Sequence, residues 1–413
     1  MQVCKRCLYN SNHPLNITFN HDGVCSGCIV HYEKDVLDWR DREEKLKRIV
    51  EEYRCKSGKN YDCIVPVSGA RDSYFIVHTV KNVLGLNPLL VTYNKQYNTA
   101  VGIRNLANLR IQFNCDIMTL TVSPDTIRKI TRATFRRLGS IYWHCHAGGT
   151  VFPVQMAVKL KIPLIIWGAH QGLDQVGMFS HADEVEMTRK YRMEHDLMGC
   201  EAEDLVSDFD GLTRDDIKPF IYPENREIEQ VGVRGIYLGN YIRWDSKSQH
   251  ESMIAKYGYE GSVQSRTFDS YNDADCWVYS DVHDYMKLIK HGFGKVLDHA
   301  TRDIRLGHLS RSDGLRLARR YTSAKLKNLD LFLDWLGITE SAFHFIADQH
   351  RNKEYWKRNG NWEWVFEDPL QHADFLSNLT KDESLVESGY QATIQKECTD
   401  RSDRYILIGK GVL

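Results

Sequence analysis

The chain has 413 residues and a mass of 48.0 kDa, which excludes a peptide hormone or a miniprotein held together by disulfides. Its 54 Lys and Arg against 55 Asp and Glu give a net charge of −1, so no global basic field favours bulk binding to nucleic acid or to a membrane surface. Hydrophobic residues at 42% and charged residues at 26% are typical of a chain that folds throughout its length.

No segment has the character of a membrane span or of a secretion signal. The longest apolar run, residues 162–169, contains a Pro and a Gly and is far shorter than the roughly 20 residues that cross a bilayer. The first residues, Met1 to Arg6, lack the apolar core of a signal peptide. We therefore expect a cytoplasmic protein without a membrane partner, in which the 11 cysteines are reduced and do not form a disulfide framework.

Four of the cysteines form two closely spaced pairs near the N-terminus. Cys4 and Cys7 make one C-x2-C pair, Cys25 and Cys28 make the other, and 17 residues separate the pairs. This spacing is typical of two-knuckle zinc sites, in which four thiolates close a tetrahedral shell around the ion. An iron–sulfur cluster is the alternative. Because a four-cysteine shell has no open position, we predict a structural zinc ion.

The segments on either side of residue 60 differ in character. Residues 1–32 are turn-rich and too short to form a core without a metal. Residues 34–58 are strongly charged, and the apolar positions between Val36 and Val50 have helical spacing, which predicts a surface helix.

From Tyr61 onward, strand, turn and helix alternate. We predict strands at 63–67, 89–93, 116–122, 164–168 and 235–238. A helix is predicted from Asp72 to Leu84, closed by Gly85, and another begins at Ser123 with Pro124 in its first turn. Such alternation predicts an α/β domain with a parallel sheet. From about residue 246 to 350 the pattern is mainly helical, and the last sixty residues give no clear signal.

The turn after the first strand reads Ser68-Gly69-Ala70-Arg71-Asp72-Ser73 and leads directly into a helix. Backbone N–H groups and a helix N-terminus then point at one place, which is an anion site. The turn lacks the spacing of Walker-type NTPases and of dinucleotide-binding loops. Asp72 can cap the helix or reach a Mg2+ ion. An ordinary capped turn is the alternative.

This turn resembles the S-G-G-x-D-S pyrophosphate loop of the PP-loop ATP pyrophosphatases, which have an adenine nucleotide alpha hydrolase-like (HUP) fold. Ala70 replaces the second glycine, so the turn would be strained if that position required a positive φ. The resemblance implies ATP and Mg2+ as cofactors. The residues that it assigns to ATP and pyrophosphate are Ser68, Gly69, Ala70, Arg71, Asp72, Ser73, Tyr93 and Gly168.

A second segment supports the same superfamily. Residues 168–175, Gly-Ala-His-Gln-Gly-Leu-Asp-Gln, are similar to the A-H-x-x-x-D-Q segment of tRNA lysidine synthetases. Both segments end parallel strands on one sheet edge, where ligands bind in such folds. The candidate catalytic residues are Asp72, His170 and Asp174, with a structural histidine as the alternative for His170.

Several segments together are similar to the N-acetyl sugar amidotransferases, which act in O-antigen, pseudaminic acid and legionaminic acid pathways. These segments are Cys4-Lys5-Arg6-Cys7, His13-Pro14-Leu15, residues 233–245, residues 290–295 and residues 298–305. The similarity extends over roughly residues 1–365, and its O-antigen branch fits best. The organisation that follows is a zinc module at 1–32, a helical linker at 33–58, a PP-loop domain at 59–245, a helical substrate-binding region at 246–365 and a tail at 366–413.

The resemblance implies that a sugar N-acetyl group becomes an acetamidino group. ATP would adenylate the amide oxygen, and ammonia would then displace AMP. The implied partners are a UDP-linked N-acetylated sugar and glutaminase and ammonia-channel subunits similar to those of imidazole glycerol phosphate synthase. Substrate contacts are assigned to Lys290, Lys295, His299, Arg302 and Arg305, for which a solvated helix face is the alternative.

A PP-loop enzyme that thiolates or lysinylates tRNA is the rival hypothesis. It would use Cys115 and Cys145 as a reactive pair, or the basic residues at 128, 129, 132, 136 and 137 for RNA. The neutral net charge and the absence of RNA-binding signatures argue against a nucleic-acid partner. A catalytically dead scaffold is a third class, because Ala70 replaces a glycine.

Overall fold

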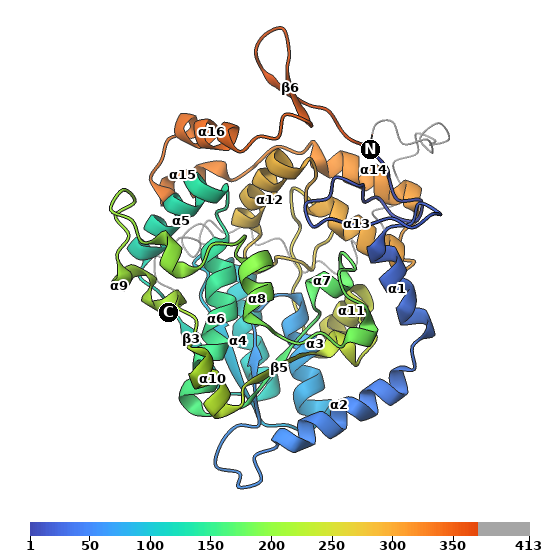
Figure 1. The fold of residues 1–413 in the computed structure, drawn as a ribbon, viewed down its shortest axis with the longest axis vertical. Coiled ribbons are helices and arrows are strands. Elements are labelled where there is room, and N and C mark those ends of the chain that lie inside the picture. Colours follow the sequence, from blue (N-terminus) through green and yellow to red (C-terminus); the bar gives the residue numbers. More distant parts are fainter. Residues whose placement is uncertain (371–413) are drawn as a thin grey trace.

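The computed structural model describes residues 1–370, without the side chains of Arg71, Trp277 and Val278. Its centre is a five-stranded sheet with all strands parallel in the order β3-β2-β1-β4-β5 (Figure 1). The strands are β1 (Cys63–Pro66), β2 (Pro88–Tyr93), β3 (Ile117–Leu120), β4 (Leu164–Trp167) and β5 (Arg234–Tyr237). The predicted parallel α/β sheet is therefore confirmed.

The central strands are continuous apolar runs because both of their faces are covered. Ile64 of β1 pairs with Leu89 of β2 and with Ile165 of β4, and all three side chains are buried. Neighbouring residues point to opposite faces, so Ile64 joins one apolar cluster while Cys63 and Val65 join another. The sheet thus separates two cores.

Helices cover both faces of this sheet. One face packs against α2, α3, α4 and α11, and the other packs against α6, which in turn contacts α5. The bounds are α1 (Ser26–Val36), α2 (Trp39–Tyr53), α3 (Arg71–His78), α4 (Ala100–Phe113), α5 (Pro124–Leu138), α6 (Trp143–Leu160) and α11 (Ser246–Tyr257). Leu46, Ile49 and Val50 of α2 are buried against the sheet. The predicted linker helix therefore helps to form the core.

The strand order creates a crevice at the carboxyl edge of the sheet. The chain moves outward from β1 to β3 and then returns to place β4 on the other side of β1. Connections after β1 and β4 leave in opposite directions at such a switch point, and open α/β sheets bind ligands there. The two segments that the sequence analysis selected, 68–73 and 168–175, follow these two strands.

Between β4 and β5 the chain makes a long excursion of short helical pieces. These are α7 (Gln171–Asp174), α8 (Arg189–Tyr191), α9 (Arg214–Ile217) and α10 (Asn225–Val231), with a π-helical turn at Arg192–Asp196 and 3-10 turns at His181–Asp183, Ala202–Leu205 and Lys218–Phe220. A further 3-10 turn, Leu238–Asn240, follows β5. The helix predicted at 72–84 is α3 followed by a π-helical turn, Thr79–Val83, and Gly85 then adopts φ +65°.

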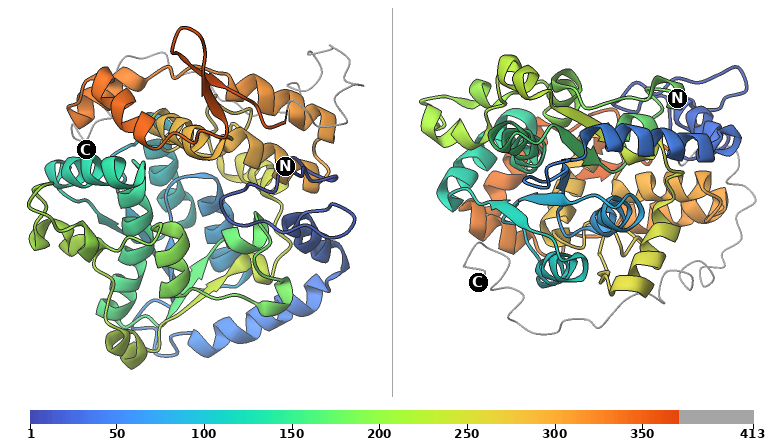
Figure 2. Two further views of the ribbon diagram at one scale, coloured as in Figure 1. Left: turned by 45° about the horizontal axis from the view of Figure 1, so that its top comes forward. Right: turned by 90° about the horizontal axis from the view of Figure 1, so that it is seen from below.

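The C-terminal part is mainly helical, as predicted. Its elements are α12 (Trp277–His291), α13 (Lys295–Arg305), α14 (Arg311–Thr322), α15 (Leu329–Leu336), α16 (Glu340–Gln349) and the hairpin of β6 (Trp356–Arg358) and β7 (Trp364–Phe366). These helices gather on one side of the molecule, and the N-terminal module lies beside α13 and α14 (Figure 2). Most of the predicted tail, 371–413, is outside the described residues. No helix within residues 1–370 has the length and apolar character that crossing a membrane requires.

Candidate functional site

The turn after β1 is held by its own hydroxyl groups. The N–H of Ser68 donates to Oγ of Ser73 at 3.1 Å, and the N–H of Ala70 donates to Oγ of Ser68 at 3.2 Å. Gly69 has φ +77°, and a Cβ there would lie 2.8 Å from the carbonyl oxygen of Gly102. Ala70 has φ −87° and is extended, so the alanine introduces no strain. Of the two positions, only Gly69 adopts a backbone conformation that requires glycine.

Asp72 lies in the first turn of α3, at the positive end of the helix dipole. Its Oδ1 is 3.4 Å from Nε2 of the buried His250 on α11, and its side chain is 30% exposed. The carboxylate is therefore positioned by a neighbouring helix while remaining accessible from the turn. The side chain of Arg71, also predicted to contact ATP, is outside what the structure describes.

A cleft of about 390 Å³ opens next to this turn. Ser68 and Tyr93, two of the residues predicted to contact ATP, lie in its wall together with Ile103 and Leu106 of α4 and Thr119 of β3. The cleft has a volume in the range of small-molecule sites, with an apolar wall on α4 and polar groups at the strand ends. Gly168, at the end of β4, is not part of its wall.

Lys95 and Asp275 close one end of the cleft with an ion pair of 2.7 Å. Burial alone would lower the pKa of Lys95, but Asp275 raises it well above its usual value, so the ammonium stays charged. The backbone N–H of Thr99 donates to the carbonyl of Asp275 at 2.9 Å, which fixes this piece of the C-terminal part at the start of α4. Neither residue of the pair was predicted from the sequence, although Lys95 lies only two positions after the end of β2.

The end of β4 faces a second, smaller cavity of about 140 Å³, which His170 lines. The imidazole is 2% exposed and contacts the rings of Tyr191 and Tyr237 at centroid distances of 4.3 and 4.7 Å. Neither ring nitrogen has a hydrogen-bond partner within residues 1–370. Burial lowers the pKa of His170 to about 4, with a smaller effect from His195, so the ring is neutral at pH 7.

Other buried polar groups around this cavity were not found from the sequence. Trp167 Nε1 and Nη2 of Arg192 are buried and have no partner in the described part of the chain. Arg192 is otherwise held by Glu201 at 2.8 Å and by Oγ1 of Thr150 at 2.9 Å. Burial raises the pKa of Asp196, which also lines the cavity, to about 6, an effect that Arg192 partly offsets. Arg192 and Asp196 come from the irregular excursion between β4 and β5, where no periodic pattern signals them, whereas Trp167 ends β4.

Asp174, predicted to be catalytic, forms an ion pair with Lys34 of α1. Burial alone would raise the pKa of Asp174, but Lys34 lowers it below its usual value. Lys34 also donates to the carbonyl oxygen of Trp244 at 3.2 Å. The Asp174 carboxylate therefore takes part in the contact, through Lys34, between the N-terminal module and the loop after β4.

The four N-terminal cysteines converge on one point. All are fully buried, and their sulfur atoms lie within 4.8 Å of one another. The Cys4–Cys28 and Cys7–Cys25 sulfur distances are 3.9 and 3.6 Å, which fit the roughly 3.8 Å edge of a tetrahedron with 2.3 Å Zn–S bonds. The donor set is therefore consistent with a structural zinc ion and offers no open coordination position.

Arg305 lies at this cysteine cluster. Its Nε is 3.4 Å from Sγ of Cys28, and one Nη is 3.6 Å from Sγ of Cys25. The other Nη donates to the carbonyl oxygen of Gln175 at 2.5 Å, and the side chain is 4% exposed. The sequence analysis assigned Arg305 to the substrate, whereas the structure places its charge against thiolates in the interior.

The other cations predicted to contact the substrate also have partners inside the protein. Lys295 binds Asp281 at 2.9 Å and Asp273 at 3.4 Å, and Arg302 binds Asp269 at 2.6 Å. The remaining contacts are Lys290 to the Leu138 carbonyl at 2.8 Å and His299 to the Thr267 hydroxyl at 2.7 Å. None of these side chains lines a cavity described here. Each of these side chains is thus held by a group of the protein itself.

The features that supported an RNA substrate are either buried thiols or basic side chains that have partners within the protein. Cys115 and Cys145 belong to different apolar clusters, and burial raises the pKa of both thiols. Arg136 and Arg137 both bind Asp210, at 2.8 and 2.5 Å, and Arg132 donates to the carbonyl of Leu336 at 2.8 Å. These groups form neither a reactive thiol pair nor an unpaired basic surface.

The structure shows an α/β protein with a five-stranded parallel sheet, a turn after β1 whose sequence resembles a PP-loop, an N-terminal four-cysteine module and a helical C-terminal region. Residues 252–368 match the family model described as LPS biosynthesis protein WbpG-like, C-terminal domain, and are called the WbpG-like C-terminal domain below. The match agrees with the resemblance drawn from the sequence and covers this part of the chain only.

Three further proteins are similar to this chain. The uncharacterized protein MJ1599 of Methanocaldococcus jannaschii is 30% identical over 120 residues, which cover 28% of this chain and 42% of that protein. NH3-dependent NAD synthetase from Campylobacter jejuni is 14% identical with a TM-score of 0.27, covering 55% of this chain and 99% of that one. NMN synthetase from Francisella tularensis is 12% identical with a TM-score of 0.26, covering 54% and 96%. Likeness at this level does not transfer the function of either synthetase.

Proposed function

We propose that this protein is an ATP-dependent amidotransferase that converts a sugar N-acetyl group to an acetamidino group in O-antigen biosynthesis. One observation carries the proposal: the cleft beside the Ser68–Ser73 turn is completed by Asp275 of the WbpG-like C-terminal domain. A nucleotide-type turn and a domain of a lipopolysaccharide-biosynthesis family thus line the same cleft.

The first step activates the amide. The acetamido oxygen attacks the α-phosphorus of ATP, the bond to the β-phosphate oxygen breaks, and pyrophosphate leaves. Loss of the amide N–H proton then gives an O-adenylyl imidate. The turn after β1 offers backbone N–H groups, the hydroxyls of Ser68 and Ser73 and the start of α3 to the departing pyrophosphate. Lys95 adds a fixed positive charge to the same cleft.

The second step replaces oxygen by nitrogen. Ammonia attacks the imidate carbon, the carbon–oxygen bond to AMP breaks, and a proton leaves the new nitrogen. His170 is a neutral imidazole with both nitrogens unpartnered in the described structure, so it offers one donor and one acceptor to the reacting groups. We assign His170 to the orientation of ammonia or of the acetamido group in the cavity at the end of β4.

The cofactors that we propose fit the donor groups. The four cysteines would hold zinc as a structural ion. Mg2+ would be held by Asp72, with the Ser68 and Ser73 hydroxyls nearby, because oxygen ligands at this turn suit a hard cation. When bound with ATP, Mg2+ offsets the charge of the phosphate groups.

The source of ammonia is part of the proposal. At neutral pH most ammonia is protonated, and water competes for the imidate, so a glutaminase that delivers ammonia directly would raise the rate. We propose glutaminase and ammonia-channel subunits similar to those of imidazole glycerol phosphate synthase, and a cytoplasmic reaction on a UDP-linked sugar.

AMP release tests the function. The purified chain is incubated with ATP, Mg2+, ammonium at alkaline pH and a UDP-linked N-acetylated sugar, and control reactions omit the sugar or replace it with tRNA. We expect AMP to form with the sugar and an acetamidino product to appear in the mass spectrum, with Asp72→Asn inactive. AMP formation with tRNA and none with the sugar would reject the proposal in favour of an RNA-modifying enzyme.

A further inference from the structure

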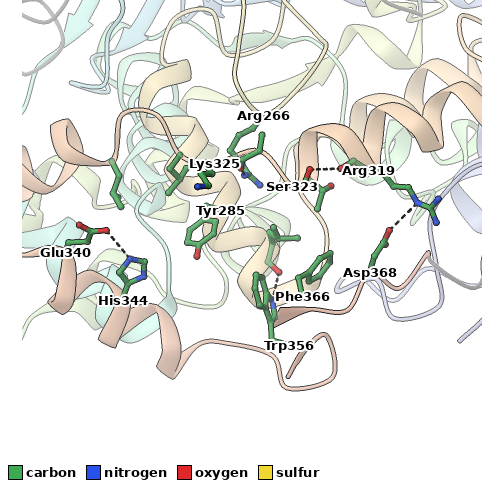
Figure 3. Close-up of a pocket in the computed structure, with 15 residues that line it drawn as sticks. Arg266, Tyr285, Arg319, Ser323, Lys325, Glu340, His344, Trp356, Phe366 and Asp368 are labelled. Atoms are coloured by element: carbon green, nitrogen blue, oxygen red, sulfur yellow. Dashed lines mark hydrogen bonds and ion pairs between the residues drawn. The ribbon is translucent and has the colours of Figure 1, made fainter. Parts of the chain in front are cut away.

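A cavity of about 660 Å³ lies entirely within the WbpG-like C-terminal domain (Figure 3). Its walls come from α12, the segment between α14 and α15, the start of α16 and the β6–β7 hairpin. It shares no wall residue with the cleft beside the Ser68–Ser73 turn or with the His170 cavity. Its volume suits a ligand larger than a simple ion.

Arg266 is a buried cation in the wall of this cavity. Its side chain is 1% exposed, its Nε binds Oδ2 of Asp284 at 2.6 Å, and one Nη donates to the carbonyl of Ala324. The second terminal nitrogen, Nη2, is buried and has no partner in the described structure. A buried guanidinium N–H without a partner is costly, and a phosphate or carboxylate oxygen is the acceptor that satisfies it best.

The exposed rim adds one available charge. Lys325 lines the cavity close to Arg266 (Figure 3) and forms no ion pair within residues 1–370. Of the two carboxylates of the rim, Asp368 pairs with Arg319 at 3.5 Å, and Glu340 lies 3.5 Å from Nε2 of His344. An incoming anion therefore meets an unpaired ammonium and a free guanidinium N–H.

The remaining walls are flat and apolar. Tyr285, Trp356 and Phe366 surround the space below Arg266, and Trp356 and Phe366 stand 5.1 Å apart between ring centroids (Figure 3). Aromatic faces bind the planar base of a nucleoside and the apolar face of a sugar ring. The cavity thus combines donors for an anion with a surface for a ring.

We propose that this cavity binds a ring-bearing phosphate or carboxylate ligand of the sugar-nucleotide class, at a site separate from the ATP cleft. The choice of a uridine nucleotide rests on the proposed function, whereas the requirement for an anion and a ring rests on the cavity alone. Arg266 and Asp275 lie nine positions apart in the segment 258–276, which has no helix or strand, so one piece of backbone lines both sites.

Binding by the full chain tests the site. Titration calorimetry with UDP-N-acetylglucosamine is performed while α,β-methylene-ATP, which resists cleavage to AMP, saturates the other site. Lys325→Gln should weaken binding about tenfold, and Arg266→Lys, which keeps the charge near Asp284 but lacks the second N–H fork, should weaken it similarly. Lys327→Gln, an exposed substitution outside the cavity, is the matched control and should change the affinity less than twofold.

The outcomes separate this site from the proposed reaction. If Lys325→Gln binds the sugar nucleotide as tightly as Lys327→Gln does, the site is overturned, whatever the enzyme does with ATP. Equal affinity for UDP-N-acetylglucosamine and for pyrophosphate would overturn the ring-binding surface. If Arg266→Lys melts at a lower temperature than the wild type, its weaker binding could reflect instability, and the affinity of the exposed Lys325→Gln variant is then the test of the site. Loss of sugar-nucleotide binding in both variants, with ATP-analogue binding unchanged, is the expected result.

Discussion

Lys34 and Asp174 form an ion pair between α1 of the cysteine module and the loop that follows β4. The contact is one of several that tie this loop to the module: Oγ of Ser26 donates to the carbonyl of Val176 at 2.9 Å, and Gln175 donates to the hydroxyl of Tyr9. A Cβ on Gly177 would overlap the carbonyl of Ser26. The metal module therefore positions the segment that carries His170.

Breaking this pair from one side should destabilise the protein. Lys34→Ala leaves the Asp174 carboxylate buried without its partner, which typically costs about 3–5 kcal/mol. We expect a lower midpoint in urea unfolding and loss of AMP formation. Lys45→Ala, which removes the partly exposed pair of α2 with Glu184, is the control and should cost under about 1 kcal/mol. Equal effects of the two substitutions would contradict a positioning role for Lys34.

The turn after β1 allows a matched pair of substitutions. Gly69→Ala places a side chain at φ +77° and 2.8 Å from the carbonyl of Gly102, so we expect strain of about 1–3 kcal/mol and weaker ATP binding. Ala70→Gly, at an ordinary φ of −87°, should leave ATP affinity within about threefold. Binding of a fluorescent ATP analogue measures both, and tighter binding by Ala70→Gly than by the wild type would show that the alanine limits the site.

Loss of the metal should act on the loop after β4. Cys25→Ser removes a ligand, and we expect release of zinc, measured with a colorimetric chelator, together with lower thermal stability and faster proteolysis near residue 175. Arg305→Lys should also weaken zinc retention, because the guanidinium contacts three of the four sulfur atoms. Sugar-nucleotide affinity that falls in Arg305→Lys while zinc content stays normal would restore the substrate role predicted from the sequence.

The pair of His308 and Asp245 predicts a pH dependence of stability. The two groups are 3.0 Å apart, and the hydrogen bond to Asp245 raises the pKa of His308 in the folded protein. A histidine with a raised pKa contributes its full stabilisation below the unfolded pKa of about 6.5 and loses it as the pH rises through the folded pKa. The melting-temperature difference between wild type and His308→Gln should therefore be larger at pH 5.5 than at pH 8.5. A difference that is constant across this range would exclude the ion pair as its cause.

The parts of the fold that could be predicted are those with local signals. Apolar runs predicted the strands, the C-x2-C pairs predicted the four-cysteine cluster, and hydroxyl and glycine spacing predicted the turn at Ser68–Ser73. The internal ion pairs of the cations on α12 and α13 could not be predicted, because their partners Asp269, Asp273 and Asp281 are brought to them by tertiary folding. The same spacing of charges is compatible with a ligand surface or with internal ion pairs.

The walls of the His170 cavity were missed for a similar reason. Arg192 and Tyr222 come from the excursion between β4 and β5, whose helices are too short for a recognisable period. Lys95 was missed because its place in the cleft depends on an ion pair with Asp275, which is 180 positions away in the chain. A side chain whose role depends on a partner far away in the sequence produces no local motif or periodicity by which it could be recognised.

Gly102, in the first turn of α4, has no room for a side chain because the backbone of Asp275 lies against it. The cleft beside the Ser68–Ser73 turn is therefore built from two regions that lie far apart in the sequence. Chimaeras that exchange the C-terminal domain between related proteins should therefore fail unless the residue at 102 and the strip at 274–276 are transferred together, so these positions are expected to evolve as one unit.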